Sequence, residues 1–268
     1  MPDVYATISE VAFEVQERLA DVIEMRFADP RQKAMMHAFL SGIDFPPDAN
    51  VLEIGCGTGA VTRTLAQWPG VAQVVGVDPS PVFIARARTL AHGIANIAFE
   101  QGDGRALAFP PEAYDVVVIY TTLSHVPQPD SLLAEAYRVL RPGGWVAAFD
   151  GDYATATVAT GSHDPLEACM DAFRENFIHD RWLIRHLPQL IRAAGFDAMP
   201  MRSYGYVEDS EAAYMLSWID RGADMLLNAG RISQEAAAAI KAEAQRRSAS
   251  RVWFGHIAFA SVQGRKPT

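Results

Sequence analysis

The sequence predicts an α/β fold, doubly wound, with a mostly parallel sheet of seven strands whose last strand is antiparallel. From residue 51 onward, short apolar runs alternate with amphipathic helical segments, and turn residues separate them. Such runs are typical of strands covered on both faces of a parallel sheet. Half of the 268 residues are hydrophobic and 21% are charged, a composition that supports one substantial core.

Helical patterns before and between the apolar runs set the order of the elements. An apolar stripe predicts a helix over 11–25, and a second helix through Leu40 follows Asp29-Pro30, where aspartate can cap it. These two helices form either a lid over the ligand site or a face packed on the sheet. Further helices are expected to open at Ala60 and to cover 81–92, 131–140 and 180–194, and strands are expected at 51–54, 74–77, 97–100, 114–120, 145–149, 196–207 and 253–262.

Composition excludes several classes of function. A net charge of -9 without a basic cluster argues against a nucleic-acid partner. No stretch approaches the roughly 20 apolar residues that membrane insertion needs. The acidic N-terminus resembles neither a signal nor a transit peptide, and two cysteines supply no disulfide framework, so a cytoplasmic location is expected. The expected partner is a small-molecule substrate, and both a monomer and a homodimer remain open.

The stretch 51–60 joins an apolar strand to a helix through three glycines, Gly55, Gly57 and Gly59. Glycines at such a junction allow a tight turn and a close approach of a ligand to the main chain. The helix N-terminus adds unpaired N–H groups and partial positive charge. Cys56 lies inside this turn, where a small side chain suffices. The stretch therefore predicts a nucleotide-like cofactor site.

Polar residues follow the predicted strands at the edge where ligands bind in doubly wound sheets. Asp78 ends the second strand, Gly102-Asp103-Gly104 the third, 120–125 the fourth and Asp150 the fifth. Because these strand ends meet at one edge of the sheet, the sequence predicts a single site there.

The glycine turn alone leaves two cofactors open. Gly55, Gly57 and Ala60 also fit the G-x-G-x-x-A form of a dinucleotide site, and Asp78 suits the ribose in either case. Two acidic groups favour a compact cationic nucleoside amino acid. Glu53 stands two residues before the first glycine, where dinucleotide sites usually have an apolar residue, and Asp103 is placed to accept from an exocyclic amine.

Four motifs share an order and spacing: Glu53-Ile-Gly-Cys-Gly-Thr-Gly59, Asp78, Gly102-Asp103 and Leu140-Arg-Pro-Gly-Gly144. Together they resemble the class I S-adenosylmethionine-dependent methyltransferases, in particular the small-molecule group related to ubiquinone/menaquinone-biosynthesis methyltransferases. The resemblance covers about residues 35–150, and 187–196 is similar to the helix-to-sixth-strand passage of that family. It implies a Rossmann-like sheet and S-adenosyl-L-methionine as cofactor.

The resemblance also implies a role for each site residue. Glu53, Gly55, Gly57 and Gly59 would line the methionine part of the cofactor, with Cys56 in the same turn. Asp78 would hold the ribose hydroxyls, Asp103 and the backbone of Gly104 the adenine, and Pro79 would pack on the adenine ring. Tyr120 and Thr121 match positions that flank the sulfonium.

Methyl transfer needs in-line approach of a nucleophile, and a general base only where that nucleophile must lose a proton. His125 follows the fourth strand and is the candidate base, although a lone histidine is more often structural. Asp150 and Asp152 resemble part of a catechol-type metal site, but the rest of that pattern is missing, so no metal is predicted.

The expected organisation is one class I methyltransferase domain over 1–268, with an N-terminal helical segment (1–48), a cofactor-binding core (49–207), a helical cap insertion (208–250) and a final strand and tail (251–268). Helices are expected over 211–229 and 233–248, and Tyr214, Met215, Trp218 and Met225 either line the substrate pocket or pack on the sheet.

The expected function is transfer of a methyl group to oxygen, nitrogen or carbon of a small molecule in an apolar pocket. The alternatives are an NAD(P)-dependent oxidoreductase and a protein that binds S-adenosylmethionine without catalysis.

Overall fold

A computed structural model describes residues 3–209 and 213–268. The strands are β1 (Ala49–Ile54), β2 (Val71–Asp78), β3 (Ile97–Gln101), β4 (Tyr114–Tyr120), β5 (Leu140–Thr157), β6 (Asp197–Ala198), β7 (Arg202–Glu208) and β8 (Gly255–Arg265). The helices are α1 (Phe13–Ala28), α2 (Pro30–Leu40), α3 (Ala60–Leu65), α4 (Pro81–Leu90), α5 (Pro129–Val139), α6 (Pro165–Asn176), α7 (Leu183–Ala193), α8 (Tyr214–Asn228) and α9 (Gln234–Ala249), with short 3-10 turns η1 (Ile8–Glu10) and η2 (Leu123–His125).

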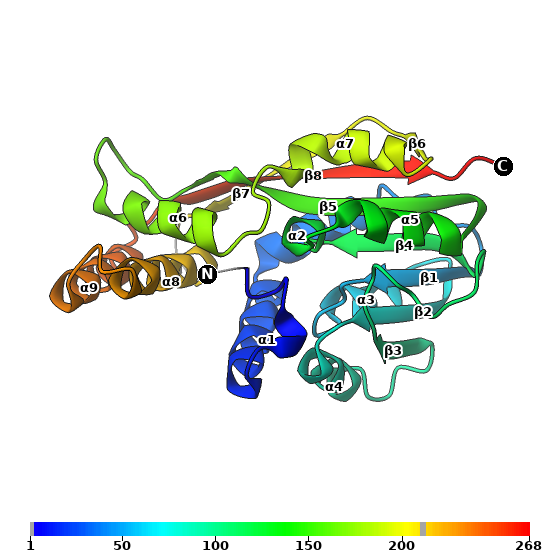
Figure 1. Cartoon of the computed structure of the whole chain (residues 1–268), viewed down its shortest axis with the longest axis horizontal. Helices are drawn as coiled ribbons and strands as arrows, with labels where there is room; N and C mark the ends of the chain where they lie inside the picture. The colour runs from blue at the N-terminus through cyan, green and yellow to red at the C-terminus, as the bar shows by residue number, and fades with distance from the viewer. Residues whose placement is uncertain (1–2, 210–212) are drawn as a thin grey trace.

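The predicted doubly wound sheet is confirmed (Figure 1). Its strand order is β3-β2-β1-β4-β5-β8-β6, and β7 also pairs with β8. Strands β1 to β5 pair in parallel, whereas β8 runs antiparallel to β5, β6 and β7. The central strands β1 and β4 are almost wholly buried, as their continuous apolar runs require. The carboxyl ends of β1, β2 and β4 therefore meet at one edge of the sheet.

The strand expected over 196–207 is divided in two. The segment between β6 and β7 contains Pro200, which has no N–H to donate to a sheet ladder. Both pieces pair with β8, so eight strands are found in the described residues where seven were expected.

Helices α2 and α3 begin where Asp29 and Gly59 in the sequence predict a helix start. The Asp29 carboxylate accepts a hydrogen bond from the Arg31 N–H at 2.7 Å and caps α2, and Gly59 caps α3 in the left-handed region with φ 78°. Helix α6 was not predicted. It follows the long β5 and belongs spatially with α8 and α9, with which it forms one end of the molecule in Figure 1.

Helix α8 packs tightly on α6 through Gly222. A Cβ atom at Gly222 would overlap the backbone carbonyl of Cys169, which cannot move without shifting α6. Trp218 adds a stacked contact with Phe173, the ring centroids lying 4.8 Å apart. We name α6, α8 and α9 the cap helices.

Gly222→Ala is expected to destabilise the protein by about 3 kcal/mol, roughly 10 °C in Tm, because two helix backbones must separate. Gly205→Ala is the matched control, since nothing lies within 4 Å of a Cβ there. Thermal unfolding of both variants checks this. Equal Tm values for the two variants would show that the α6–α8 contact is not rigid.

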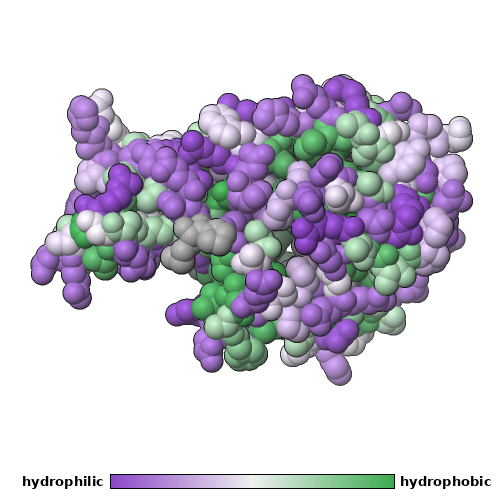
Figure 2. Space-filling view, in the orientation of Figure 1, coloured by the Kyte–Doolittle hydropathy of each residue, from purple (hydrophilic) through white to green (hydrophobic). Residues whose placement is uncertain are grey.

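The surface is mostly hydrophilic, and apolar residues gather over α1, beside the cap helices (Figure 2). Phe13 on that helix is 61% exposed. Within residues 3–209 and 213–268, none of the helices combines the length and apolar character needed to cross a bilayer.

Candidate functional site

A cavity of about 230 Å³ lies at the carboxyl ends of β1, β2 and β4. Residues of α1, α6 and α8 also line it, so the first helix and the cap helices cover the sheet edge. The structure brings together every predicted site residue except Gly59, namely Glu53, Gly55, Cys56, Gly57, Asp78, Pro79, Asp103, Gly104, Tyr120, Thr121 and His125.

The glycine turn depends on three positive φ angles, 76° at Gly55, 53° at Gly57 and 78° at Gly59. A Cβ atom at Gly55 would overlap the Thr122 side chain, so the turn lies directly against the end of β4. Gly59 faces away from the cavity, and a Cβ there would lie 2.6 Å from the Phe99 ring. Its role is to begin α3 and to pack, because it does not reach the cavity.

Cys56 lies in the turn with its side chain buried. Burial raises the pKa of the thiol well above its usual value, so the reactive thiolate is disfavoured. Its N–H donates to the Val77 carbonyl at 3.0 Å. Cys56 thus connects the turn to β2 and forms part of the cavity wall, and it does not act as a nucleophile.

Glu53 ends β1 with only 2% of its surface exposed. Its carboxylate accepts a hydrogen bond from the Thr62 hydroxyl at 2.5 Å. Burial raises the pKa of Glu53 to about 8, despite that bond. A buried carboxyl in this state becomes a stable carboxylate when a cation arrives beside it.

Asp78 ends β2 and holds the glycine turn. Its two oxygens accept backbone N–H bonds from Gly57 and Ser80, each at 2.9 Å. Burial raises the pKa of Asp78 to about 6, while the two N–H donors oppose that rise. Each oxygen keeps a free lone pair, which suits a pair of neighbouring hydroxyl groups.

Asp103 is engaged by a neighbour that the sequence reasoning missed. Arg105 donates to both oxygens of Asp103, at 2.7–3.1 Å, and these bonds hold the carboxyl pKa below its usual value. The Asp103 side chain is 45% exposed and Arg105 also lines the cavity. An amine ligand must therefore share Asp103 with Arg105.

The pH dependence of stability is expected to follow Glu53. Its pKa is about 8 when folded and 4.5 in the reference state, so the folded protein keeps this proton to higher pH. The stabilisation that the protonated Glu53 carboxyl provides is complete below pH 4.5 and is lost as the pH rises to 8. Tm of the ligand-free protein should fall over this range, by several degrees.

Glu53→Gln is expected to flatten that fall, because the amide cannot ionise. Glu100→Gln, on exposed β3 surface, is the matched control and should keep the slope. Differential scanning calorimetry across the range measures both. If Tm falls as steeply with pH in Glu53→Gln as in the wild-type protein, the group that titrates is not Glu53.

The end of β4 has an unusual backbone. Thr121 has φ 50°, uncommon for a residue other than glycine, and its N–H donates to the Phe149 carbonyl at 2.6 Å. The Tyr120 ring stacks on Phe149 with centroids 4.5 Å apart. Tyr120 Oη is buried and has no hydrogen-bond partner within the described chain. Both residues line the cavity, where a strained strand end often serves a ligand.

His125 is paired with a residue from the other end of the sequence. Its Nδ1 lies 2.6 Å from Oδ2 of Asp3, whose side chain is fully buried and also accepts N–H bonds from Tyr5 and His179. Burial lowers the pKa of His125, but the Asp3 and Asp150 carboxylates outweigh it, so the pKa is raised. No local sequence pattern indicates this pair, because the two residues are 122 positions apart.

The two acidic residues of the discarded metal pattern are already engaged. Asp150 accepts from the Ser124 N–H and hydroxyl at 3.0 and 2.9 Å and from the Gly151 N–H. Asp152 accepts from Arg185 at 2.9 Å. These carboxylates hold η2 and α7 against β5.

Of the four residues with two open alternatives, Tyr214 and Trp218 line the cavity, whereas Met215 and Met225 do not. Met215 is fully buried and Met225 packs against the same core, because their helical positions face away from the site.

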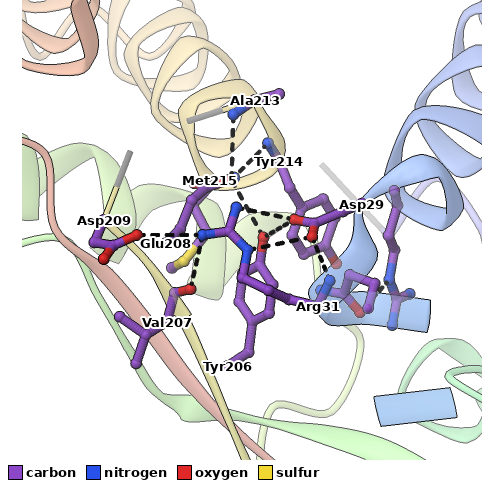
Figure 3. A network of polar contacts seen from close by, with 11 residues as sticks. Asp29, Arg31, Tyr206, Val207, Glu208, Asp209, Ala213, Tyr214 and Met215 are labelled. Carbon is purple, nitrogen blue, oxygen red and sulfur yellow. Dashed lines mark hydrogen bonds and ion pairs between the residues drawn. The ribbon is translucent and has the colours of Figure 1, made fainter. Parts of the chain in front are cut away.

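A polar network fixes the start of α8 (Figure 3). The Tyr206 hydroxyl donates to Asp29 at 2.7 Å, and Arg31 binds the same carboxylate. Glu208 accepts three backbone N–H bonds at the first turn of α8, a favourable place for a carboxylate. The junction of α1 and α2 is thereby fastened to β7 and to Tyr214.

The lining therefore divides by chemistry. Buried carboxylates and the glycine turn occupy the strand ends, where they fit a ligand with a cation and a ribose. The N-terminal segment, α1, α6 and α8 add aromatic rings and the guanidinium groups of Arg26 and Arg221, whereas Tyr120, Tyr153 and Arg105 come from the sheet side.

Comparisons with known proteins agree with this geometry. Residues 51–144 match the family described as "Methyltransferase domain". Ubiquinone biosynthesis O-methyltransferase of Pseudomonas fluorescens is 30% identical over 129 residues, covering 42% of this chain and 55% of that protein. The chain spans about half the length of such curated relatives.

Two solved structures share the fold. Phosphoethanolamine N-methyltransferase 2 of Haemonchus contortus, in complex with S-adenosyl-L-methionine, has a TM-score of 0.53 and 20% identity, covering 88% of this chain and 53% of that chain. The [4+2]-cyclase SpnF has a TM-score of 0.56 and 20% identity, covering 88% and 82%. Residues 51–144 of the chain thus match a methyltransferase domain, and the chain shares its fold with these solved structures.

Proposed function

We propose that the protein transfers a methyl group from S-adenosyl-L-methionine to a small-molecule acceptor. One observation carries the proposal: Glu53 and Asp78, buried at adjacent strand ends around the glycine turn, open into the same cavity as an aromatic chamber. A cationic ligand and a ribose match the first part, and an apolar acceptor matches the second.

The residues present fit the cofactor. Asp78 offers two oxygens to the ribose hydroxyls, and Glu53 offers a buried carboxylate to the positive charge of the methionine part. Pro79, Asp103 and Gly104 would hold the adenine, and Tyr120 and Thr121 would flank the sulfonium; all five residues line the cavity. The bound cofactor supplies an electrophilic methyl group.

The chain's own residues would enclose and prepare the acceptor. Tyr5, Tyr153 and Trp218 line the cavity and exclude water from it, which strengthens every electrostatic contact inside. The Asp3–His125 bond fixes the imidazole with its Nδ1 hydrogen toward Asp3, leaving Nε2 to take a proton from an oxygen or nitrogen acceptor.

The alternatives predict different behaviour. The cyclase neighbour shows that this fold also occurs in a protein named for another reaction, so the fold alone does not define the chemistry. An NAD(P)-dependent oxidoreductase would need a partner for a pyrophosphate, whereas carboxylates dominate the strand ends. The acidic charge of -9 supports a small molecule over a nucleic acid, and a cytoplasmic location belongs to the same proposal.

Sustained formation of S-adenosylhomocysteine tests the proposal. The protein is incubated with S-adenosylmethionine and a pool of small-molecule metabolites, and mass spectrometry follows both the product and any gain of a methyl group. Multiple turnovers with a methylated product support the proposal. Cofactor binding without turnover across such pools would instead favour the non-catalytic alternative.

A further inference from the structure

Arg26 on α1 is a buried cation in the wall of the cavity, with 8% of its surface exposed. Its Nη1 donates to the Thr121 hydroxyl at 3.0 Å and its Nε to the Gln32 side-chain oxygen at 3.4 Å. Its Nη2 is buried without any partner among residues 3–209 and 213–268. No carboxylate of the described chain forms an ion pair with Arg26, since both of its hydrogen-bond partners are neutral.

The surroundings offer this charge no direct ion pair, although the Asp150 carboxylate acts on it from a distance. The rings of Phe27, Tyr120, Tyr214 and Phe259 lie 5.4–5.8 Å from the guanidinium carbon, and they offer only the weak attraction of aromatic faces. Burial raises the pKa of the two tyrosine hydroxyls, so both stay neutral. A buried charge without a counter-charge is costly, and proteins usually supply a partner.

A second guanidinium faces the same chamber. Arg221 on α8 lines the cavity and lies over the Phe177 ring at 4.7 Å. It has no ion pair among the residues that the structure describes. The third cavity arginine, Arg105, is already paired with Asp103 on the cofactor side. The unpaired positive charge is therefore concentrated where the acceptor would lie.

We propose that the methyl acceptor is a small organic acid whose carboxylate pairs with Arg26, its apolar body lying among the aromatic rings of the chamber. The guanidinium fork fits a planar carboxylate, and Nη2 is the donor left for it. Arg221 is only partly buried, so its charge keeps contact with water, whereas Arg26 is buried and balances a single negative charge. This difference favours a carboxylate over a phosphate monoester with nearly two charges. The inference rests on the proposed function and specifies its substrate class.

The test compares acids with their uncharged isosteres. The protein saturated with S-adenosylhomocysteine is titrated calorimetrically with benzoate, cinnamate and octanoate, with the three corresponding amides, and with phenyl phosphate. At least one acid is expected to bind tenfold or more tightly than its amide. Amides that bind as well as the acids, or no binding by any acid, would overturn the inference. Tighter binding of phenyl phosphate than of benzoate would overturn the assignment of a carboxylate.

Variants locate the effect. Arg26→Gln is expected to abolish the preference for acid over amide, and Arg26→Lys, which keeps the charge, to retain part of it. Arg18→Gln, an exposed arginine on the same helix, is the matched control and should keep the full preference. A preference that survives Arg26→Gln would refute the role of Arg26.

The same titrations separate this inference from the proposed function. Failure of the wild-type protein to bind S-adenosylhomocysteine contradicts the function itself. Normal cofactor binding combined with indifference to acceptor charge contradicts only the carboxylate inference.

Discussion

Asp78→Ala is expected to weaken S-adenosylhomocysteine binding by about a hundredfold or more. The change removes the carboxylate that would accept two hydrogen bonds from the ribose hydroxyls, each worth about 1.5–3 kcal/mol. A hundredfold loss of affinity corresponds to about 2.7 kcal/mol, which is less than the two bonds together. It also removes the tether from Asp78 to the Gly57 N–H, which fixes the glycine turn. Isothermal titration of wild type and variant measures the ratio.

The control for this result is His125→Ala, which should leave cofactor affinity within a factor of about three, since His125 contacts Asp3 and not the glycine turn. Circular dichroism establishes that both variants fold. Equal losses of affinity in the two variants would contradict the assignment of separate roles to Asp78 and His125.

His125→Ala is expected to lower turnover by about 10²–10⁴-fold, the usual contribution of a positioned general base. The loss should appear for an oxygen or nitrogen acceptor that must surrender a proton. Steady-state rates with an acceptor found in the metabolite pool provide the measurement. His92→Ala, an exposed histidine after α4, is the matched control and should keep the wild-type rate.

Asp3→Asn tests how His125 is tuned. The Asp3 carboxylate raises the pKa of His125, so its removal should lower that pKa. A base works when unprotonated, and the rising limb of the pH–rate profile should therefore move to lower pH in Asp3→Asn. An unmoved limb would mean that His125 is structural, even if the rate falls.

Much of the fold was predictable because its signals are local. The apolar runs of β1 and β4, the glycine turn and the Asp29 cap each lie within a few residues of sequence, and the structure has them where expected. The division of the strand at Pro200 was also a local signal, since proline rarely lies inside a paired strand. Helix α6 was not predicted, although the Asp164 cap and the buried positions Leu166, Cys169, Met170 and Phe173 follow a helical period.

The acceptor side of the site could not be read from the sequence. Asp3 and His125 meet across 122 positions, and Arg26 lies one residue beyond the helix expected over 11–25, outside every motif. Only packing shows that α1 turns this guanidinium into the cavity. Arg105 is different, because it lies two residues after Asp103, close enough in sequence for the pairing to be a local signal.

The central claim is that the glycine turn and its carboxylates bind a methyl donor. Isothermal titration of the wild-type protein with S-adenosylhomocysteine and, separately, with NADH tests it most directly. We expect saturable binding of S-adenosylhomocysteine with one site per chain and no binding of NADH. Binding of NADH alone would contradict it.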